Sequence, residues 1–402
     1  MQLEDTIKLD QSYYMNTFGE RLPVQFTHGN GAVLYDSNNK KYIDFIAGIG
    51  VNSLGYNHPS LVEAIQKQAE KLLHCSNLFY IESQAKLAKI LSDANRGGRV
   101  FFCNSGAEAN EAAIKLVRKY FHDQGAPHKY EILTAQNSFH GRTLAALAAT
   151  GQEKYQKPFE PMPSGFKYIP YNNLEAAEEA VTENTAAVMI EVIQGEGGVI
   201  KGSTEYIQGL EALCREKGLL LIADEVQTGI GRTGKVFAYE HYDIEPDIIT
   251  LAKGLGGGIP IGAVVAKGEA AEVLTPGSHG STFGGNPLAC TAGLVVMETI
   301  LEEDFLDQVK LKGNFFESGL IGMRQRNSII DEVRGIGLML GIKLHEAIPG
   351  KEVVQKALNA GFIINYAGQN TLRFLPPLII TKEEIHQLLI TLEGILMPYF
   401  WK

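Results

Sequence analysis

The chain has 402 residues, of which 45% are hydrophobic and 20% charged, and its formal net charge at pH 7 is −10. Such a composition is typical of a globular protein with a large core and two or more domains. The chain is acidic and has no basic run, which argues against nucleic acid as a partner. The four cysteines form no C-x-x-C pair, which argues against a zinc site or a disulfide framework. The acidic N-terminus and the lack of an apolar run of roughly 20 residues argue against a signal peptide and a membrane span. We therefore expect a cytoplasmic protein that binds neither metal nor membrane.

In chain order, the first predicted elements are a hairpin and a helix. Residues 31–45 contain two alternating runs around a polar turn, and residues 58–74 have the apolar spacing of a helix that begins near Pro59. From residue 99 onward, short apolar strands alternate with helical stretches. The predicted strands cover 99–103, 130–134, 186–192, 219–224, 248–252 and 261–266, and the predicted helices cover 107–121, 142–150 and 204–218. This alternation indicates a mainly parallel sheet with helices on both faces.

The pattern changes after about residue 289. The predicted elements there are a long helix over 293–323, a strand over 336–344, a helix over 351–361, short strands over 362–365 and 371–375, and a final helix over 381–397. We therefore predict an α/β fold in three parts. Residues 1–55 form an N-terminal segment whose hairpin contributes to the small domain, residues 56–290 form a large domain, and residues 291–402 form a smaller α+β domain.

A glycine-rich segment, "DEVQTGIGRTGKV" over 224–236, fits two phosphate-loop patterns. A P-loop needs Ser or Thr after its lysine, but Val236 stands there. A dinucleotide loop must follow a strand directly and open a helix, whereas polar or short residues separate the strand from Gly229. A nucleotide-binding protein that uses the loop 229–235 is therefore the disfavoured alternative from a different class.

Asp224 and Lys253 carry the stronger signal. Asp224 ends a predicted buried strand at the sheet edge where ligands bind in α/β folds, although a lone Asp could also cap a turn. Lys253 follows another apolar strand inside the glycine-rich "LAKGLGGGIPIG", so burial is favoured over the usual surface position. Burial lowers the pKa of an amine, as Schiff-base formation requires. A lysine together with an aspartate on a ring nitrogen is how proteins hold pyridoxal 5′-phosphate (PLP).

A phosphate site is expected where Ser105, Gly106 and Ala107 connect a strand to a helix, since helix N-termini bind phosphate. Ser105 and Glu108 also fit an ordinary capping box, and both interpretations can hold together.

Eight segments together resemble the class III aminotransferases of the fold type I PLP enzymes, over nearly the whole chain. They are "YIDFIAGIGVNSLGYNHP", "NSGAEANEAAIKLVRKY", "NSFHGRT", "IEVIQGEGG", "LLIADEVQTGIGRTG", "LAKGLGGGIPIGA", "HGSTFGGNPLAC" and "LRFLPPL". Val192 stands where this family usually has proline.

The resemblance implies roles for the cofactor-binding residues. Lys253 would bond to the cofactor and later shuttle the substrate proton, and Asp224 would pair with the pyridinium nitrogen. Gln227 would contact the phenol oxygen, Phe139 would stack on the ring instead of filling a core, and the Ser105–Ala107 turn would hold the phosphate.

For the substrate, the resemblance implies that Arg142 clamps a carboxylate, which suits a bidentate guanidinium. Glu196 would neutralise Arg373 while the amine donor binds, and a structural salt bridge is the alternative. In a homodimer with shared sites, Thr282 would reach the phosphate of the neighbouring subunit and Ser281 would lie beside the substrate, although both hydroxyls could simply form turns.

The implied reaction is a ping-pong transfer from N-acetylornithine to 2-oxoglutarate, which gives N-acetylglutamate 5-semialdehyde and glutamate in arginine biosynthesis. Ornithine, succinylornithine, succinyldiaminopimelate and 4-aminobutyrate remain alternative donors, and an aminomutase remains a related alternative. A non-catalytic binding protein on this fold would be expected to lose Lys253.

Overall fold

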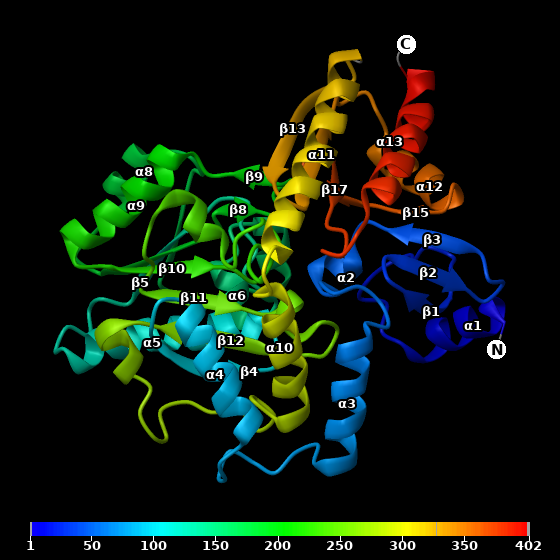
Figure 1. The fold of residues 1–402 in the computed structure, drawn as a ribbon. Helices are drawn as coiled ribbons and strands as arrows, with labels where there is room; N and C mark the ends of the chain where they lie inside the picture. Colours follow the sequence, from blue (N-terminus) through cyan, green and yellow to red (C-terminus); the bar gives the residue numbers. More distant parts are fainter. Residues whose placement is uncertain (1, 327, 400–402) are drawn as a thin grey trace.

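The structure, a computed structural model, describes residues 2–326 and 328–399. Its centre is a seven-stranded sheet with helices packed around it (Figure 1). The strands in spatial order are β4 (Arg99–Cys103), β12 (Gly262–Ala266), β11 (Ile248–Leu251), β10 (Leu220–Asp224), β7 (Thr185–Ile190), β5 (Glu131–Ala135) and β6 (Phe166–Ile169). Only β12 pairs antiparallel with its neighbours β11 and β4, and every other pair of this sheet is parallel. The mainly parallel α/β sheet predicted from the sequence is confirmed.

Alternate residues of each central strand enter two different cores. In β10, Leu221 and Ala223 join one buried cluster, while Leu220 and Ile222 join another. The first cluster contains residues of α9 (Thr204–Lys217), and the second contains the alanine-rich face of α5 (Gly106–Asp123). Because successive side chains of a strand point to opposite faces, a strand covered on both sides has an unbroken apolar run.

A second lobe is built from both ends of the chain (Figure 1). One four-stranded sheet has the order β1 (Phe26–Asn30), β2 (Val33–Asp36), β3 (Lys41–Asp44) and β15 (Phe362–Ile363). Another has the order β13 (Ile330–Ile336), β14 (Met339–Leu344), β17 (Thr371–Phe374) and β16 (Asn365–Ala367). The helices of this region are α11 (Phe305–Arg326), α12 (Gly350–Asn359) and α13 (Lys382–Leu396). The predicted hairpin is therefore present as β2–β3, and β3 pairs in parallel with β15.

The predicted long helix over 293–323 is wrong, because two helices occupy this region. They are α10 (Pro287–Ile300) and α11, and Asp304 between them has a left-handed φ of 69° that a continuing helix cannot accommodate. The apolar spacing continues through the break, so periodicity alone does not reveal it.

The remaining helices and strands are shorter or lie at the edges. They are α1 (Leu3–Tyr13), α2 (Ala47–Gly50), α3 (Pro59–Lys71), α4 (Glu82–Ala94), α6 (Leu144–Ala149), α7 (Glu153–Gln156), α8 (Leu174–Ala180), β8 (Ile193–Gln194) and β9 (Ile200–Lys201). Helix α3 begins at Pro59 as predicted, whereas α1, α4, β6 and β13 are additions to the predicted elements. No helix among the described residues is long and apolar enough to cross a membrane.

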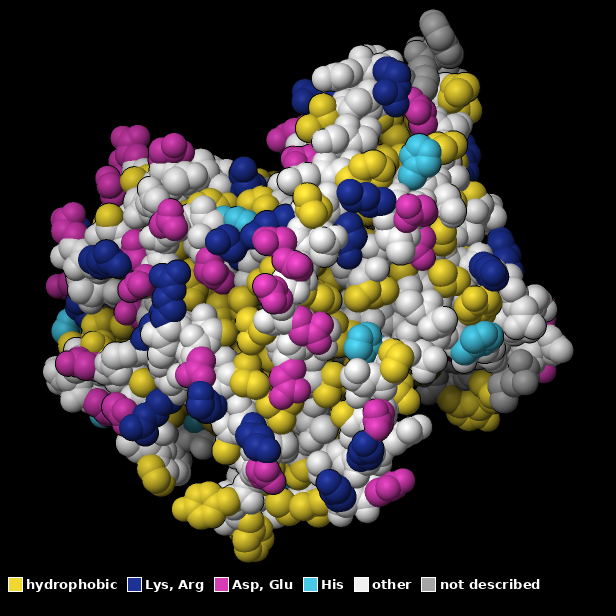
Figure 2. All heavy atoms as spheres, viewed as in Figure 1, with side chains coloured by type: hydrophobic (Ala, Val, Ile, Leu, Met, Phe, Trp, Pro, Cys, Tyr) yellow, Lys and Arg dark blue, Asp and Glu magenta, His cyan; other side chains and the backbone are white. Residues whose placement is uncertain are grey.

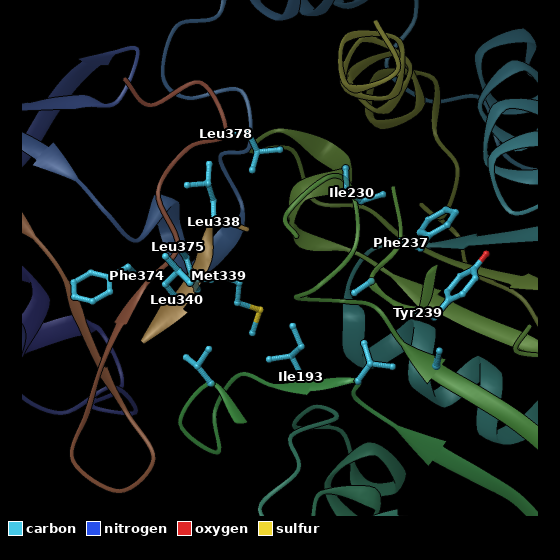
Figure 3. Packing of buried hydrophobic residues seen from close by; sticks show 14 of the residues in the cluster. Ile193, Ile230, Phe237, Tyr239, Leu338, Met339, Leu340, Phe374, Leu375 and Leu378 are labelled. Carbon is cyan, nitrogen blue, oxygen red and sulfur yellow. The ribbon is translucent and has the colours of Figure 1, made fainter. Parts of the chain in front are cut away.

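The glycine-rich segment 224–236 is a packing element between the sheet and the C-terminal lobe. Arg232 is buried and donates hydrogen bonds to the carbonyls of Leu338 (3.1 Å) and Pro376 (2.5 Å). A Cβ at Gly337 would lie 2.5 Å from the carbonyl carbon of Thr233. Ile230 belongs to the same buried cluster as Leu338 and Leu378 (Figure 3). The segment leads into a short 3₁₀ helix, Ala238–Tyr242, and not into the α-helix that a nucleotide loop requires.

Candidate active site

A cavity of about 420 Å³ lies at the carboxyl ends of the parallel strands. Asp224 ends β10, Lys253 follows β11, and Glu191 follows β7, so chain segments that are far apart in sequence meet at one edge. The predicted site residues that line the cavity are Ser105, Gly106, Ala107, Phe139, Arg142, Glu196, Asp224, Gln227 and Lys253. The structure therefore brings together most of the residues that the sequence singled out.

Asp224 is buried and anchored by donors on both oxygens. Its Oδ2 accepts hydrogen bonds from His140 Nδ1 (2.7 Å) and Asn110 Nδ2 (2.9 Å), and its Oδ1 accepts one from the amide of Val226 (3.0 Å). Burial alone would lower the pKa of His140, but the hydrogen bond and charge of Asp224 outweigh it and raise that pKa. His140 and Asn110 therefore hold the Asp224 side chain in one orientation at the cavity.

Lys253 begins a short 3₁₀ helix, Lys253–Gly256, and its φ of 41° lies in the left-handed region. Such a conformation is costly for a residue with a side chain and is maintained only when the surrounding structure enforces it. Burial lowers the pKa of the Lys253 amine, and the positive charge of Arg373 acts in the same direction, against the charges of Glu196 and Asp224. The amine is therefore more readily deprotonated than a surface lysine, as a nucleophilic amine requires.

Helix α5 presents free backbone amides to the cavity. Ser105 is its N-cap, and the Ser105 hydroxyl accepts a hydrogen bond from the amide of Glu108 (3.2 Å). The first amides, those of Gly106 and Ala107, have no acceptor within the helix. The predicted capping box is only half formed, because the Glu108 carboxylate accepts from the amide of Asn104 and not from that of the N-cap.

Phe139 and Arg142 also line the cavity, on a segment that packs against the first turn of α5, because a Cβ at Gly141 would lie 2.8 Å from Ala107 Cβ. The amide of Phe139 donates to Glu191 Oε2 (3.0 Å), and burial raises the pKa of the Glu191 carboxyl. The exposed Arg142 lies just before α6, with its guanidinium carbon 3.9 Å from the ring centroid of Tyr155 and 5.4 Å from that of Phe139.

Arg373 is paired with two residues that line the cavity. It comes from β17, is almost fully buried, and donates through one nitrogen to Glu196 Oε1 (2.6 Å) and Gln227 Oε1 (3.2 Å). Burial would raise the pKa of Glu196, but the charge of Arg373 lowers it. Since Arg373 Nε is buried without a hydrogen-bond partner in the described part of the chain, the guanidinium has donor capacity to spare.

Ser281 and Thr282 are separated by the structure. Ser281 accepts a hydrogen bond from Asn104 Nδ2 (3.1 Å), and Asn104 lines the cavity. Thr282 is exposed and does not line this chain's cavity. Within one chain, therefore, Thr282 is the predicted site residue that lies outside the group.

The sequence-based prediction missed four residues at the site: Asn110, His140, Tyr155 and Glu191. The sequence position pointed to three of them. His140 directly follows Phe139 in the loop "NSFHGRT", and Glu191 directly follows an apolar strand. Asn110 lies four residues after Gly106 on α5, which places it on the same helix face. Tyr155, on the four-residue helix α7, had no such signal.

These groups fit PLP. The lysine amine has a lowered pKa, the buried aspartate is hydrogen-bonded to a histidine, and the helix offers free amides for a phosphate. A Cβ at Gly106 would lie 2.7 Å from Val226 Cγ1, so the phosphate turn packs directly on the loop that follows Asp224.

Comparisons with known proteins agree with this geometry. The family model described as aminotransferase class-III matches residues 14–396. The acetylornithine aminotransferase of Caldanaerobacter subterraneus subsp. tengcongensis is 53% identical, over 97% of this chain and 98% of the relative, and that of Methanocaldococcus jannaschii is 51% identical, over 98% of each.

Solved structures of related enzymes share the fold of this chain at lower sequence identity. The ornithine aminotransferase of Toxoplasma gondii ME49 has a TM-score of 0.95 at 34% identity and covers 99% of this chain and 96% of its own. The N-acetylornithine aminotransferase of Stenotrophomonas maltophilia K279a has a TM-score of 0.84 at 38% identity, and the match covers 98% of this chain and 99% of that one. The chain belongs to the class III aminotransferases, which are PLP-dependent enzymes whose substrates are free amino acids and other small molecules.

Proposed function

We propose that this enzyme transfers the terminal amino group of N-acetylornithine to 2-oxoglutarate, in the cytoplasm, as a step of arginine biosynthesis. One observation carries the proposal: a single cavity combines the Lys253 amine and Asp224 with a free arginine, Arg142, and its wall residues Glu196 and Gln227 accept hydrogen bonds from a second, masked arginine, Arg373. The first relatives named above share about half of their residues with this chain and are named for this activity.

Bound PLP supplies an electron sink for the electrons that remain when a substrate C–H proton is removed. Lys253 would hold the cofactor through its amine and, when substrate is bound, would accept that proton at the same nitrogen. Its lowered pKa keeps more of the amine in the neutral form that can accept a proton. Asp224 holds a proton on the ring nitrogen, and His140 and Asn110 keep the Asp224 carboxylate in place.

The two arginines address the different shapes of the two substrates. N-acetylornithine reacts at its terminal amine, so its carboxylate is far from the reacting carbon and needs only Arg142. Glutamate reacts at its α-amine and therefore presents a second carboxylate close to the reacting carbon, where Arg373 is available once Glu196 releases it. The 2.6 Å pair between Arg373 and Glu196 corresponds to the arrangement for the donor.

The enzyme acts as a homodimer in this proposal, with Thr282 of each subunit reaching the phosphate of its neighbour. Thr282 is exposed, and the adjacent Phe283 is 61% exposed. Leu78, Phe79 and Tyr80, in the loop between α3 and α4, are also exposed. Figure 2 shows hydrophobic side chains protruding at the lower edge of the molecule near this loop. Apolar surface of this kind is typical of an interface.

A donor panel tests the choice of substrate. The purified protein with PLP and 2-oxoglutarate is offered N-acetylornithine, ornithine, succinyldiaminopimelate or 4-aminobutyrate. We expect the highest kcat/KM with N-acetylornithine, and at least tenfold preference for another donor would overturn the assignment. Lys253→Ala, measured beside it, should lose turnover together with the visible absorption that borohydride abolishes in the wild type.

A further inference from the structure

Arg142 is held in place without an acidic partner. Among the described residues it forms no ion pair and no side-chain hydrogen bond, although an arginine has five N–H donors. Its contacts are aromatic: the guanidinium carbon is 3.9 Å from the centre of the Tyr155 ring and 5.4 Å from that of Phe139. A guanidinium that lies over a ring keeps its in-plane N–H groups available for a carboxylate.

The Tyr155 ring is itself fixed by the cavity wall. It meets Phe139 edge to face, with ring centroids 6.4 Å apart and planes at 86°. The backbone of Phe139 is in turn bonded to Glu191. Phe139 and Tyr155 therefore form an aromatic corner against which the guanidinium of Arg142 lies, and both Phe139 and Arg142 line the cavity.

We propose that Tyr155 is a positioning residue that holds the Arg142 guanidinium ready for the substrate carboxylate. This inference deepens the proposed function and rests on it, since it requires that Arg142 binds that carboxylate. A long exposed arginine loses rotational freedom when it binds a ligand, and an aromatic face that already restricts it reduces this loss. The contribution is made by the ring and not by the hydroxyl.

The geometry separates this role from a general structural one. Loss of the ring should weaken binding of donors that have the carboxylate and leave other donors unaffected. N-acetyl-1,4-diaminobutane is the matched probe, because it is N-acetylornithine without the carboxylate. Lys154 offers a matched control, because its ammonium lies 4.7 Å from the centre of the same ring but it does not line the cavity.

The test compares Tyr155→Phe, Tyr155→Leu and Lys154→Ala, each as the PLP-loaded enzyme, in single-turnover reactions with both donors. Tyr155→Leu should weaken the apparent affinity for N-acetylornithine about three- to tenfold, which corresponds to an exposed cation–π contact with some added freedom of the arginine. The maximal rate should stay within about twofold, and the rate with N-acetyl-1,4-diaminobutane should not change. Tyr155→Phe and Lys154→Ala should behave as the wild type.

Equal losses with both donors from Tyr155→Leu would overturn the proposal, because they would indicate a structural defect. A loss in Tyr155→Phe as large as that in Tyr155→Leu would also overturn it and assign the effect to the hydroxyl. Arg142→Ala distinguishes the role proposed for Arg142 from the role proposed for Tyr155. If Arg142→Ala leaves N-acetylornithine binding unchanged, the role proposed for Arg142 fails, whereas a harmful Arg142→Ala beside a harmless Tyr155→Leu rejects the positioning role alone.

Discussion

At the scale of single residues, the charge of Asp224 is the feature on which the chemistry depends most. Its two oxygens accept hydrogen bonds from His140, Asn110 and the amide of Val226, which fix the carboxylate at the cavity. Asp224→Asn should still bind PLP but transaminate about 10³-fold more slowly, since a neutral amide does not keep the ring nitrogen protonated. Single-turnover rates measure this directly. A variant within about tenfold of the wild type would mean that Asp224 only orients the ring.

His140 makes a pH-dependent contribution to stability. Its pKa is raised in the folded protein, so its contribution is fully present below the unfolded value of about 6.5 and is lost as the pH rises through the folded value. The free energy of unfolding of the apoprotein, relative to that of His140→Asn, should therefore fall above pH 6.5 by at most about 1.4 kcal/mol per pH unit. Urea unfolding at several pH values measures it. Both proteins retain Glu191, but the charge of His140 lowers the raised pKa of Glu191, so the difference reports the two groups together. A difference that does not vary with pH would show that folding does not raise the pKa of His140.

The pair of Arg373 and Glu196 is testable by separating the two half-reactions. Arg373→Ala should slow the reaction with 2-oxoglutarate by about 2–4 kcal/mol in barrier, as for the loss of a hydrogen-bonded charge pair, and affect the N-acetylornithine reaction much less. Arg142→Ala, the matched comparison, should slow both. Equal damage to both half-reactions from Arg373→Ala would instead favour a structural salt bridge.

At the scale of elements, the sequence predicts what depends on local pattern. Strands β4, β5, β7, β10 and β11 were predictable because buried strands have unbroken apolar runs, and the site followed because their carboxyl ends meet at one edge. The antiparallel direction of β12 was not predictable from the sequence, because an apolar run is the same in a parallel and in an antiparallel strand. The contacts of His140 and Tyr155 depend on how distant loops approach one another, which no local spacing records.

The N-terminus of α5 yields a prediction about an element. In Gly106→Ala the new Cβ would lie 2.7 Å from Val226 Cγ1, so the phosphate turn must move away from the loop after Asp224. Overpacking of this kind costs about 1–3 kcal/mol, and we expect PLP affinity to fall about tenfold. Gly394→Ala in α13 is the control, because its Cβ would meet nothing within 4 Å. Spectroscopic titration with PLP measures the affinity of both variants. An unchanged affinity in Gly106→Ala would show that this turn does not bind the phosphate.

At the scale of the whole molecule, the site depends on both lobes. Lys253 and Asp224 come from the large sheet, whereas Arg373 comes from β17 in the lobe that the two chain ends form together. The division into residues 1–55, 56–290 and 291–402 stays a prediction. Because α10 continues past residue 290 and packs against α3 and α4, we propose that the small domain begins at the break after residue 300.

Thr282 is expected to contribute to the cofactor site of the neighbouring subunit in a dimer. Lys253→Ala lacks the amine that bonds to PLP, and Thr282→Ala lacks the hydroxyl proposed for the neighbour's phosphate. In a mixed dimer of the two variants, one site combines an intact Lys253 with an intact Thr282 if Thr282 acts in trans. Differently tagged variants, co-expressed and purified through both tags, should then bind PLP with wild-type affinity at one site per dimer. The Thr282→Ala homodimer should bind it more weakly at both sites. If Thr282 acted within its own chain, the mixed dimer would keep the weakened affinity. The exposed position of Thr282 outside its own cavity favours the first result.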